Sequence, residues 1–385
     1  MDKCKVSRQT RILFQGIDSL HHYYIVLPRY IQALSQEIYI DIYTQDLLEI
    51  PRAFQFSLKR FHDIALNIPL SLLLSQQKRS PPSKVMVQKH TSKYHMAHLN
   101  EPFTKDVKVI MASTVQRIPK VLTFHDPKML YYSKEKIATL ESIVYRFDAV
   151  TVPSLWMKNI FQEKIGLDPV VIPHCVDFAL FNITNKKETA RKSLGINAIS
   201  KVVIWNGRLD PDKDPVTMVN VIKLLAKQDK EVFFILKYRT NYYDPVYTNG
   251  VLKEIRRLKG LLGNRLKIFS GGMSLHEMPI LYRAADLYFT TSPLESFSLA
   301  TAEAMACGLP IVAPSSSAIP EVVGDAGVYC NVGDVESFYK NILRILNDDK
   351  LSRELSRKSL RRVIRNFNPA RIAQLYLDLY KSVLR

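Results

Sequence analysis

Two glutamates, Glu295 and Glu303, lie eight positions apart in the segment 292–312, which reads SPLESFSLATAEAMACGLPIV. The pattern predicts a loop that carries the first carboxylate and a helix that carries the second about two turns in. Backbone N–H groups at the start of such a helix form a ready anion site. A carboxylate beside an anion needs a hydroxyl or a cation as its partner, and the second carboxylate could accept two hydrogen bonds from a vicinal diol such as a ribose. Phosphate between two polyols describes a nucleotide sugar, whereas the competing interpretation pairs Glu303 with a cation on an ordinary surface helix.

The helix of this segment is expected to begin at Ser296 or Ser298 and to end at Ala306. Gly308 is a typical helix terminator, and Pro310 prevents the helix from restarting. Alanines at alternate positions keep the helix thin. Another backbone or a ligand can therefore approach it closely.

A second candidate site is the segment 205–215, WNGRLDPDKDP, which follows an apolar strand and precedes a helix. Arg208 and Lys213 flank a turn at the carboxyl end of that strand, where both could reach a diphosphate. Each charge-assisted hydrogen bond to phosphate contributes roughly 1.5–3 kcal/mol. The competing interpretation is that the two cations pair with Asp210 and Asp212 at the surface.

The elements that must position these groups are short apolar strands separated by helical patterns. Near-continuous apolar strands that alternate with amphipathic helices indicate parallel sheets covered on both faces. The expected fold class is therefore α/β, with two Rossmann-like doubly wound domains that face each other across a ligand-binding cleft. The expected strands are 11–16, 38–44, 84–90, 107–114, 120–126, 149–154 and 169–174 in the first half, and 201–207, 231–238, 265–271, 286–292, 309–315 and 327–330 in the second.

The chain length of 385 residues favours two domains of roughly 150–200 residues each. The first domain is expected over 1–176 and the second over 201–365, with the polar segment 177–200 as the linker. The four cysteines show neither metal-type nor dense disulfide spacing, which favours a reducing compartment. No signal-peptide core is seen at the N-terminus, and the apolar stretch 64–74 falls short of the roughly twenty residues that span a bilayer. The expectation is a cytoplasmic protein.

The net charge of +18 is compatible with nucleic acid, an anionic membrane or polyanionic small ligands. No nucleic-acid motif is evident, so no nucleic-acid partner is expected. Two basic segments could contact a membrane peripherally: 53–79, which mixes apolar residues with basic flanks, and the last 35 residues. The competing interpretations are a core-packing helix for the first and a solvated helix face for the second. The basic residues of the second are Arg353, Arg357, Lys358, Arg361, Arg362 and Arg365.

Several motifs in a fixed order resemble the retaining family 4 glycosyltransferases of GT-B fold. They are GRLDPDK, then SGGMSLHEMPILYRAADLYFTTSPLESFSLATAEAMACGLPIVA, then IPEVVGDAGVYCNVGD, and together they cover about 200–330. The segment NFNPARIAQLYLDLYKSVL resembles the closing helices of that family, so residues 366–385 are expected to form a helix that returns to the first domain. In the first half, VLTFHD, TVPSLWMKNIF and VIPHCVDFALFN match in weaker form.

The resemblance implies roles for the candidate residues. Arg208 and Lys213 would bind the donor diphosphate, Glu295 the hydroxyls of the transferred sugar, and Glu303 the ribose. The backbone amides of Phe297, Ser298 and Leu299 would hold the distal phosphate.

In the same way, the resemblance implies donor contacts at Gly16 and Gly207 and places His125 near the transferred sugar. Taken by itself, His125 is a lone histidine at a strand end, for which a structural role is the alternative. The chain departs from the family pattern at three positions. Gly16 is followed by IDSLHHYY instead of a glycine-rich loop, and Cys175 replaces the glycine of the VIPxGVD-type hinge. Ser298 also replaces a glycine, so this position is expected to lose access to positive φ.

The expected activity is transfer of a sugar from a nucleotide diphosphate donor to a hydroxyl of a glycan or lipid-linked acceptor. The resemblance implies retention of anomeric configuration. Neither a metal nor a cofactor is expected, because positive charge from Arg208 and Lys213 crowds the Asp210-Pro211-Asp212 pair. The alternatives are an epimerase or phosphorylase of the same fold, a basic nucleic-acid-binding protein and a sugar-nucleotide binder without catalysis.

Overall fold

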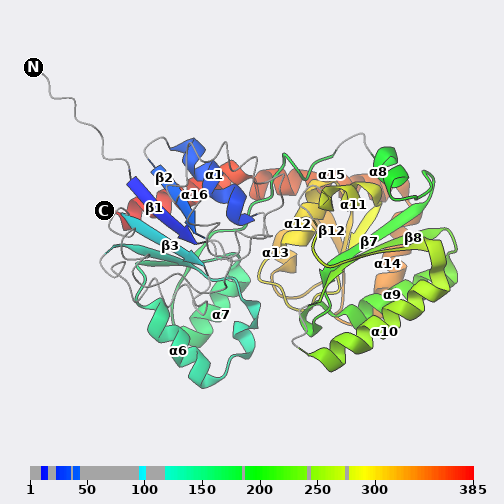
Figure 1. The fold of residues 1–385 in the computed structure, drawn as a ribbon, viewed down its shortest axis with the longest axis horizontal. Helices are drawn as coiled ribbons and strands as arrows, with labels where there is room; N and C mark the ends of the chain where they lie inside the picture. The colour runs from blue at the N-terminus through cyan, green and yellow to red at the C-terminus, as the bar shows by residue number, and fades with distance from the viewer. Residues whose placement is uncertain are drawn as a thin grey trace, which may run out of the picture. The chain divides into compact units, whose positions relative to one another are not determined.

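The computed structural model describes residues 10–15, 23–35, 38–43, 95–100, 118–183, 187–240, 244–273 and 277–385. The chain divides into two units, one formed by 1–175 with 369–385 and the other by 176–368. Within the described residues, each unit contains one six-stranded sheet whose neighbouring strands are all parallel (Figure 1). The expected α/β class with two parallel-sheet domains is therefore confirmed.

The sheet of the first unit has the strand order β2-β1-β3-β4-β5-β6. Helix α7 begins where the Ser154 side chain accepts a hydrogen bond from the amide of Met157, and it ends at Gly166, which adopts positive φ. The elements are β1 (Thr10–Gln15), α1 (Tyr23–Leu34), β2 (Ile38–Tyr43), β3 (Met96–Asn100), β4 (Lys120–Thr123), η3 (Pro127–Tyr131), α6 (Lys134–Val144), β5 (Ala149–Val152), α7 (Leu155–Ile165), β6 (Val170–Val171) and α16 (Pro369–Val383).

A buried polar network joins the C-terminal helix α16 to this sheet. His98 on β3 is hydrogen-bonded through Nδ1 to the Tyr380 hydroxyl at 2.6 Å and through Nε2 to the Thr123 hydroxyl at 2.6 Å. Thr123 also contacts the hydroxyls of Tyr376, at 3.3 Å, and Thr151, at 2.7 Å. Burial lowers the pKa of His98 to about 3, so its ring is neutral at physiological pH. Helix α16 is thus fixed by specific hydrogen bonds as well as by apolar packing.

The sheet of the second unit has the strand order β12-β11-β10-β7-β8-β9. Its helices and strands alternate along the chain, as a doubly wound sheet requires. The elements are α8 (Lys187–Ser193), β7 (Lys201–Arg208), η4 (Pro211–Lys213), α9 (Pro215–Gln228), β8 (Val232–Arg239), α10 (Pro245–Leu262), η5 (Gly263–Arg265), β9 (Leu266–Ser270), α11 (Met278–Ala284), β10 (Leu287–Phe289), α12 (Leu299–Ala306), β11 (Ile311–Pro314), α13 (Ile319–Val323), η6 (Gly324–Ala326), β12 (Gly327–Cys330), α14 (Val335–Asn347) and α15 (Asp349–Asn366).

Strand β7 shows why this sheet is covered on both faces. Its buried residues alternate between two core clusters: Val202 and Ile204 pack with α11 and α12, whereas Val203 and Trp205 pack with α9, α10 and α14. Figure 1 shows α9 and α10 on one side of β7 and β8, with α11 and α12 on the other. A strand with two buried faces needs a continuous apolar run, and KVVIW supplies it.

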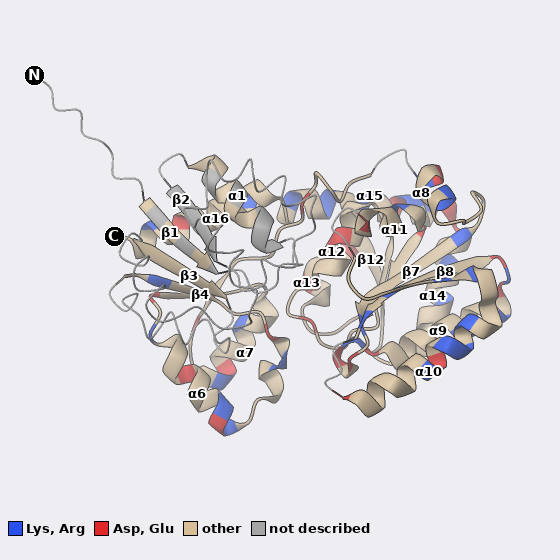
Figure 2. Ribbon diagram, viewed as in Figure 1, with Lys and Arg blue, Asp and Glu red and all other residues tan. Residues whose placement is uncertain are grey.

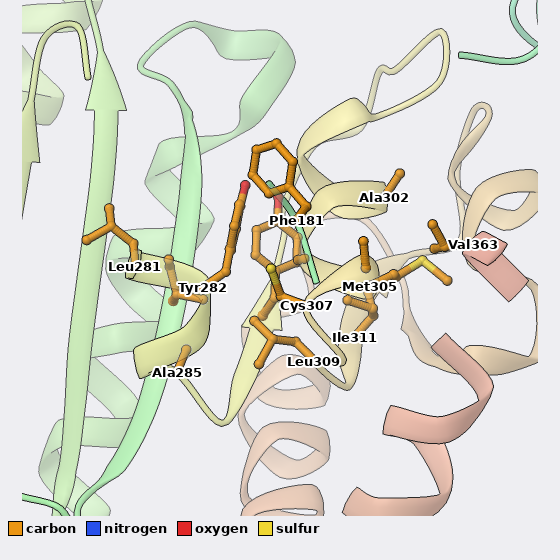
Figure 3. Packing of buried hydrophobic residues seen from close by; sticks show 14 of the residues in the cluster. Phe181, Leu281, Tyr282, Ala285, Ala302, Met305, Cys307, Leu309, Ile311 and Val363 are labelled. Atoms are coloured by element: carbon orange, nitrogen blue, oxygen red, sulfur yellow. The ribbon is translucent and has the colours of Figure 1, made fainter. Parts of the chain in front are cut away.

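The polar segment 177–200, expected to be a linker, contributes to the core of the second unit. Phe181 is buried and its ring lies 6.1 Å from that of Tyr282, as Figure 3 shows among the packed side chains of this cluster. Ala190 on α8 and Ile196 belong to the same cluster. Arg191, also on α8, is buried and its guanidinium contacts the Asp286 carboxylate at 2.6 Å, which ties the segment to the start of β10.

Most expected strands of the described residues are present. The expected strands 169–174 and 286–292 are much shortened, to Val170–Val171 and Leu287–Phe289, and β3 (Met96–Asn100) was not predicted. All five β3 residues are buried, but His98 and Asn100 interrupt the apolar pattern that marks a buried strand. The expected strands 84–90 and 107–114 lie outside the described residues.

No helix among the described residues combines the length and apolar character that a bilayer crossing requires. The basic and apolar segment 53–79 lies outside those residues.

Candidate active site

The carboxyl end of β7 positions Arg208. Its Nε donates to Asp210 Oδ2 at 2.8 Å and its Nη2 to Asp212 Oδ2 at 2.6 Å. Both aspartates are buried, whereas the Arg208 side chain is 38% exposed. Burial acts to lower the pKa of Arg208, but the negative charges of Asp212, Asp210 and Glu295 outweigh this effect and raise it above its usual value. Arg208 is therefore a permanent cation that two buried carboxylates hold in one orientation.

Lys213 and Glu295 form the second charged contact of the site. Lys213 Nζ lies 2.8 Å from Glu295 Oε1 and 3.8 Å from Asp212 Oδ2. The side chains of Lys213 and Glu295 are only 12% and 15% exposed, so this ion pair is far less screened than one at the surface. Figure 2 shows acidic and basic segments alternating where β7 continues toward α9. Arg208, Lys213 and Glu295 thus lie in one cluster although Glu295 is far away in the sequence.

The loop that carries Lys213 is fixed by neighbours on β7 and after β10. The Thr291 hydroxyl donates to the carbonyls of Lys213 and Asp214, at 2.8 and 2.9 Å, and it accepts from Trp205 Nε1 at 3.1 Å. Asp214 takes a positive φ of 44° and caps α9 by accepting from the amide of Thr217. The lysine is therefore held by a rigid turn as well as by its ion pair.

Gly207 provides the space that this arrangement requires. A Cβ at this position would lie 2.7 Å from Cη2 of the Trp205 ring, closer than real Cβ contacts allow. Gly207 thus lets Trp205 fold against β7 and reach Thr291. The expected contact of Gly207 with the donor stays a prediction.

Helix α12 begins at Leu299, later than the expected start at Ser296 or Ser298. Ser298 is its N-cap residue and takes φ 75° and ψ 66°, so the expectation that serine excludes positive φ is wrong. Its hydroxyl is 2.8 Å from that of Thr301, a contact that accompanies the strained backbone. Phe297 is buried and its ring packs 5.0 Å from that of Phe367. The side chain of Phe297 therefore belongs to the core, which leaves its backbone amide as the group expected to contact a ligand.

Glu303 lies about one turn into α12, not two, because the helix begins late. Its Oε2 accepts from the Tyr282 hydroxyl at 3.3 Å, and that hydroxyl accepts from Asn206 Nδ2 on β7 at 3.0 Å. Burial raises the pKa of Glu303 to about 8, so the carboxyl is largely protonated at pH 7. A protonated carboxyl can donate one hydrogen bond to a diol and accept another. Tyr282 and Asn206 were not among the sequence candidates, since neither residue type is distinctive by itself.

His125 belongs to the first unit and is described there by itself. Its Nε2 is 3.1 Å from Asn100 Oδ1 at the end of β3, and its ring lies 4.8 Å from that of His174 at a tilt of 32°. These residues follow the carboxyl ends of β3, β4 and β6, the edge at which parallel sheets bind ligands. His174 was not a candidate, although it is the histidine of the quoted motif VIPHCVD.

The structure therefore brings Lys213 and Glu295 into direct contact, joins Arg208 to this pair through Asp212, and links Glu303 to β7 through Tyr282. Gly16 lies outside the described residues, and Cys175 is buried in the first unit. Within the described part of the chain, no three His, Cys, Asp or Glu side chains converge in a way that would hold a metal ion.

Comparison with protein families assigns both halves of the chain. Residues 186–362 match the family described as Glycosyl transferases group 1, and residues 7–180 match that described as Glycosyltransferase Family 4. The chain belongs to the family 4, group 1 glycosyltransferases. The order of motifs around Arg208 and Glu295 predicted this membership, which is confirmed.

Solved structures show that this family 4 member has the GT-B fold. Anabaena HepE in complex with UDP and glucose is 22% identical, with a TM-score of 0.75 over 97% of this chain and 100% of that one. Sucrose-phosphate synthase from Thermosynechococcus elongatus is 20% identical, with a TM-score of 0.73 over 97% and 99% of the two chains.

Curated relatives of this family 4 chain match over shorter regions. N-acetyl-alpha-D-glucosaminyl L-malate synthase of Bacillus anthracis is 36% identical over 107 residues, which are 27% of this chain and 28% of that protein. UDP-Gal:alpha-D-GlcNAc-diphosphoundecaprenol alpha-1,3-galactosyltransferase of Escherichia coli is 26% identical over 232 residues, 58% of this chain and 57% of that protein. The chain thus matches less than two thirds of the length of either relative.

Proposed function

We propose that this protein transfers a sugar from a nucleotide diphosphate donor to a hydroxyl group of a glycan or lipid-linked acceptor, with retention of anomeric configuration. The observation that carries the proposal is the 2.8 Å contact of Lys213 with Glu295 in the cluster that contains Arg208. Two cations suited to a diphosphate and one acid suited to sugar hydroxyls thereby occupy a single site. Family membership supplies the reaction class, and HepE, of the same fold, is described in complexes with UDP and glucose and with UDP-glucose.

The proposed reaction breaks the bond between the anomeric carbon and the diphosphate oxygen and forms a bond from that carbon to the acceptor oxygen. The bonding electrons pass to the diphosphate, and the acceptor proton passes to the leaving phosphate. Arg208 and Lys213 stabilise the charge that develops on the leaving group, as preorganised charges do most effectively in a shielded site. Backbone N–H groups at the start of α12, near Ser298 and Leu299, add partial positive charge.

We propose that the donor diphosphate draws Lys213 away from Glu295. The freed Glu295 carboxylate then accepts hydrogen bonds from the hydroxyls of the sugar, which fixes the sugar for transfer. Glu303, largely protonated at pH 7, contacts the ribose diol, and Gly207 lies beside the donor. Since Asp210 and Asp212 are already bonded to Arg208, we propose that cationic side chains supply the charge stabilisation without a metal ion.

The two domains take different substrates in this proposal. The second domain, 201–365, binds the donor, because it contains the charged cluster. The first domain, 1–176 with the closing helix of 366–385, binds the acceptor, and His125 lies near the transferred sugar. The Escherichia coli relative named above is described as acting on a diphosphoundecaprenol-linked acceptor, which supports a lipid-linked acceptor as one candidate.

A product assay with purified protein and a panel of labelled nucleotide sugars tests the proposal. Lys213→Ala and Glu295→Ala should each lower kcat/KM by roughly 10²–10³-fold, the usual loss when one transition-state contact is removed. The matched control is the ion pair of Lys223 and Glu254 on α9 and α10, whose atoms also lie 2.8 Å apart but which lies outside the charged cluster. Lys223→Ala and Glu254→Ala should leave transfer unchanged.

A second variant separates binding from chemistry. Glu295→Gln removes the competitor for Lys213, so the donor KM should stay equal or fall while kcat falls strongly. Near-normal turnover of Glu295→Ala would refute the assignment. Formation of an epimerised nucleotide sugar would show that the protein is an epimerase of this fold. Formation of a sugar phosphate would show that it is a phosphorylase.

A further inference from the structure

Four arginines follow one another along the exposed side of helix α15. Arg353, Arg357, Arg361 and Arg365 follow one another at four-residue intervals, and all four are exposed. At 3.6 residues per turn, each step rotates by about 40°, so the row drifts by about 120° over its length. The twelve residues between the first and the last arginine rise by about 18 Å. We call these four residues the arginine row.

The opposite side of α15 attaches the helix to the second unit. Leu355, Ser359 and Val363 are buried, and the Ser359 hydroxyl donates to the carbonyl of Leu309 at 2.9 Å. Arg362, which is not in the row, donates to the carbonyls of Val322 at 2.7 Å and of Glu321 at 2.6 Å. The fold therefore uses the buried side and Arg362 for attachment, and within the row Arg357 Nε donates to the carbonyl of Arg353 at 3.3 Å.

The charge of the row is only weakly compensated. Asp349 reaches Arg353 at 4.0 Å, with both side chains more than two-thirds exposed, and Glu354 pairs with Lys358 at 3.0 Å. Among the described residues, no ion pair joins the other three arginines to a carboxylate. Like charges at four-residue spacing repel each other, so the row lowers helix stability unless an anionic partner covers it.

We propose that the arginine row is a docking surface for a lipid bilayer that contains anionic headgroups. The row extends over about 18 Å of the exposed side of α15. Ile364, which is 49% exposed, lies in the sequence between the third and fourth arginines. An exposed apolar side chain among basic residues is typical of helices that lie at a membrane interface. The sequence of α15 contains no aromatic residue on which an unpaired base could stack, so lipid fits better than single-stranded nucleic acid. This contact is separate from the sugar-transfer proposal, and it would hold even if the donor site had another role.

Sedimentation of the 385-residue protein with vesicles tests the docking surface. Vesicles of phosphatidylcholine with about 30% phosphatidylglycerol should bind the protein at low salt, and pure phosphatidylcholine should not. Each basic residue near an anionic surface contributes about fivefold in affinity, so R353Q/R357Q/R361Q/R365Q should weaken binding by several hundredfold. The matched control K227Q/K230Q/K253Q/R256Q removes the same charge from exposed positions of α9, of α10 and of the loop between α9 and β8, and it should bind nearly as wild type. Raising the salt concentration to about 0.5 M should release the wild-type protein.

Two further measurements make the outcome decisive. Ile364→Ser should weaken vesicle binding several-fold while leaving the far-ultraviolet spectrum and the melting temperature unchanged. The same variants are then assayed for transfer to a soluble acceptor, which should be unaffected, so failure of docking and failure of transfer are distinguishable. The proposal is overturned if both quadruple variants lose equal affinity, or if wild type ignores anionic vesicles at low salt. It is also overturned if the row is required for oligonucleotide binding but not for vesicle binding.

Discussion

The buried ring of His98 should make the stability of the first unit depend on pH. In the folded protein its two nitrogens are occupied by the hydroxyls of Tyr380 and Thr123, and burial lowers its pKa from 6.5 to about 3. In the unfolded chain the ring binds a proton below pH 6.5, whereas the folded protein accepts one only near pH 3. The contribution of His98 to the free energy of unfolding is therefore fully present above pH 6.5 and is lost as the pH falls toward 3. The slope is about 1.4 kcal/mol per pH unit, which gives a loss of about 2 kcal/mol between pH 8 and pH 5.

Urea unfolding followed by tryptophan fluorescence can isolate this effect. The chain has two tryptophans, Trp156 in the first unit and Trp205 in the second, so a Trp205→Phe background leaves one reporter for the first unit. In this background the free energy of unfolding should fall by about 2 kcal/mol more between pH 8 and pH 5 than it does when His98→Gln is added. Carboxylates and other groups that titrate in both proteins contribute equally to the two pH dependences, so their contribution cancels in the comparison.

Tyr380→Phe is the control for lost packing and hydrogen bonding. Removing the hydroxyl that contacts His98 should cost about 1 kcal/mol at both pH values while leaving the pH-dependent loss in place. If the His98→Gln protein loses as much stability between pH 8 and pH 5 as its parent, the ring does not titrate as argued.

Substitutions at three other positions test the second unit and its site. Ser298→Gly should be more stable than Ser298→Ala by about 1–2 kcal/mol in thermal unfolding, because only glycine takes a φ of 75° without strain. Gly308→Ala should lower the free energy of unfolding by about 1–3 kcal/mol, because φ is 78° and a Cβ would lie 2.5 Å from the Ile183 side chain. The control Gly250→Ala, which has open space around it, should not lower it. If Glu303 holds the ribose in its protonated form, Glu303→Gln should keep donor affinity at pH 7 within a few-fold of wild type. Glu303→Ala should lower donor affinity by about tenfold. Calorimetry measures both, and equal losses of affinity would contradict the protonated form.

The fold class could be predicted because burial on both faces of a parallel sheet leaves a direct trace in the sequence. In β7 the run KVVIW is apolar throughout, and its residues divide between two cores. The end of α12 could also be predicted, because it depends on a glycine close to it in the sequence. Gly308 takes φ 78°, and its amide donates to the carbonyl of Met305 at 2.9 Å. In these cases the determining interaction lies within a few residues of the pattern.

Strand β3 could not be predicted in this way because its polar residues find their partners far away. His98 is buried because Tyr380, 282 positions later, supplies a hydroxyl, and Thr123 supplies another. A local pattern shows only an interrupted apolar run. The backbone of Ser298 is a comparable case: the residue type argued against positive φ, and the structure has it because the loop must turn into α12 with Phe297 buried. Tertiary packing overrides local preference at both positions.

Of the candidate site, the sequence indicated which residues carry charge but not which of them bind each other. The ion pair of Lys213 with Glu295 joins loops that follow β7 and β10, which are adjacent in the sheet but 82 residues apart at these positions. Parallel topology explains the meeting, because the carboxyl ends of neighbouring strands reach the same edge. The competing interpretation of Arg208, that it pairs with Asp210 and Asp212, is observed as well. The two interpretations are compatible, since the aspartates occupy Nε and Nη2 and leave other N–H groups of the guanidinium for a ligand.

The charge balance of the cluster constrains how a donor can bind. Three carboxylates surround two cations, so in the proposed function a diphosphate binds the remaining N–H groups of Arg208 and competes with Glu295 for Lys213. Asp210 and Asp212 are buried and hold Arg208, whereas Glu295 lies in a loop and contacts Lys213 through a single ion pair. Glu295 is therefore the carboxylate that can move. A diphosphate alone would free Lys213 but leave Glu295 without a partner in a shielded site, which is costly. In the proposed function a nucleotide sugar supplies hydroxyls for that same carboxylate, so we expect tighter binding of the intact donor than of the nucleoside diphosphate that remains after transfer.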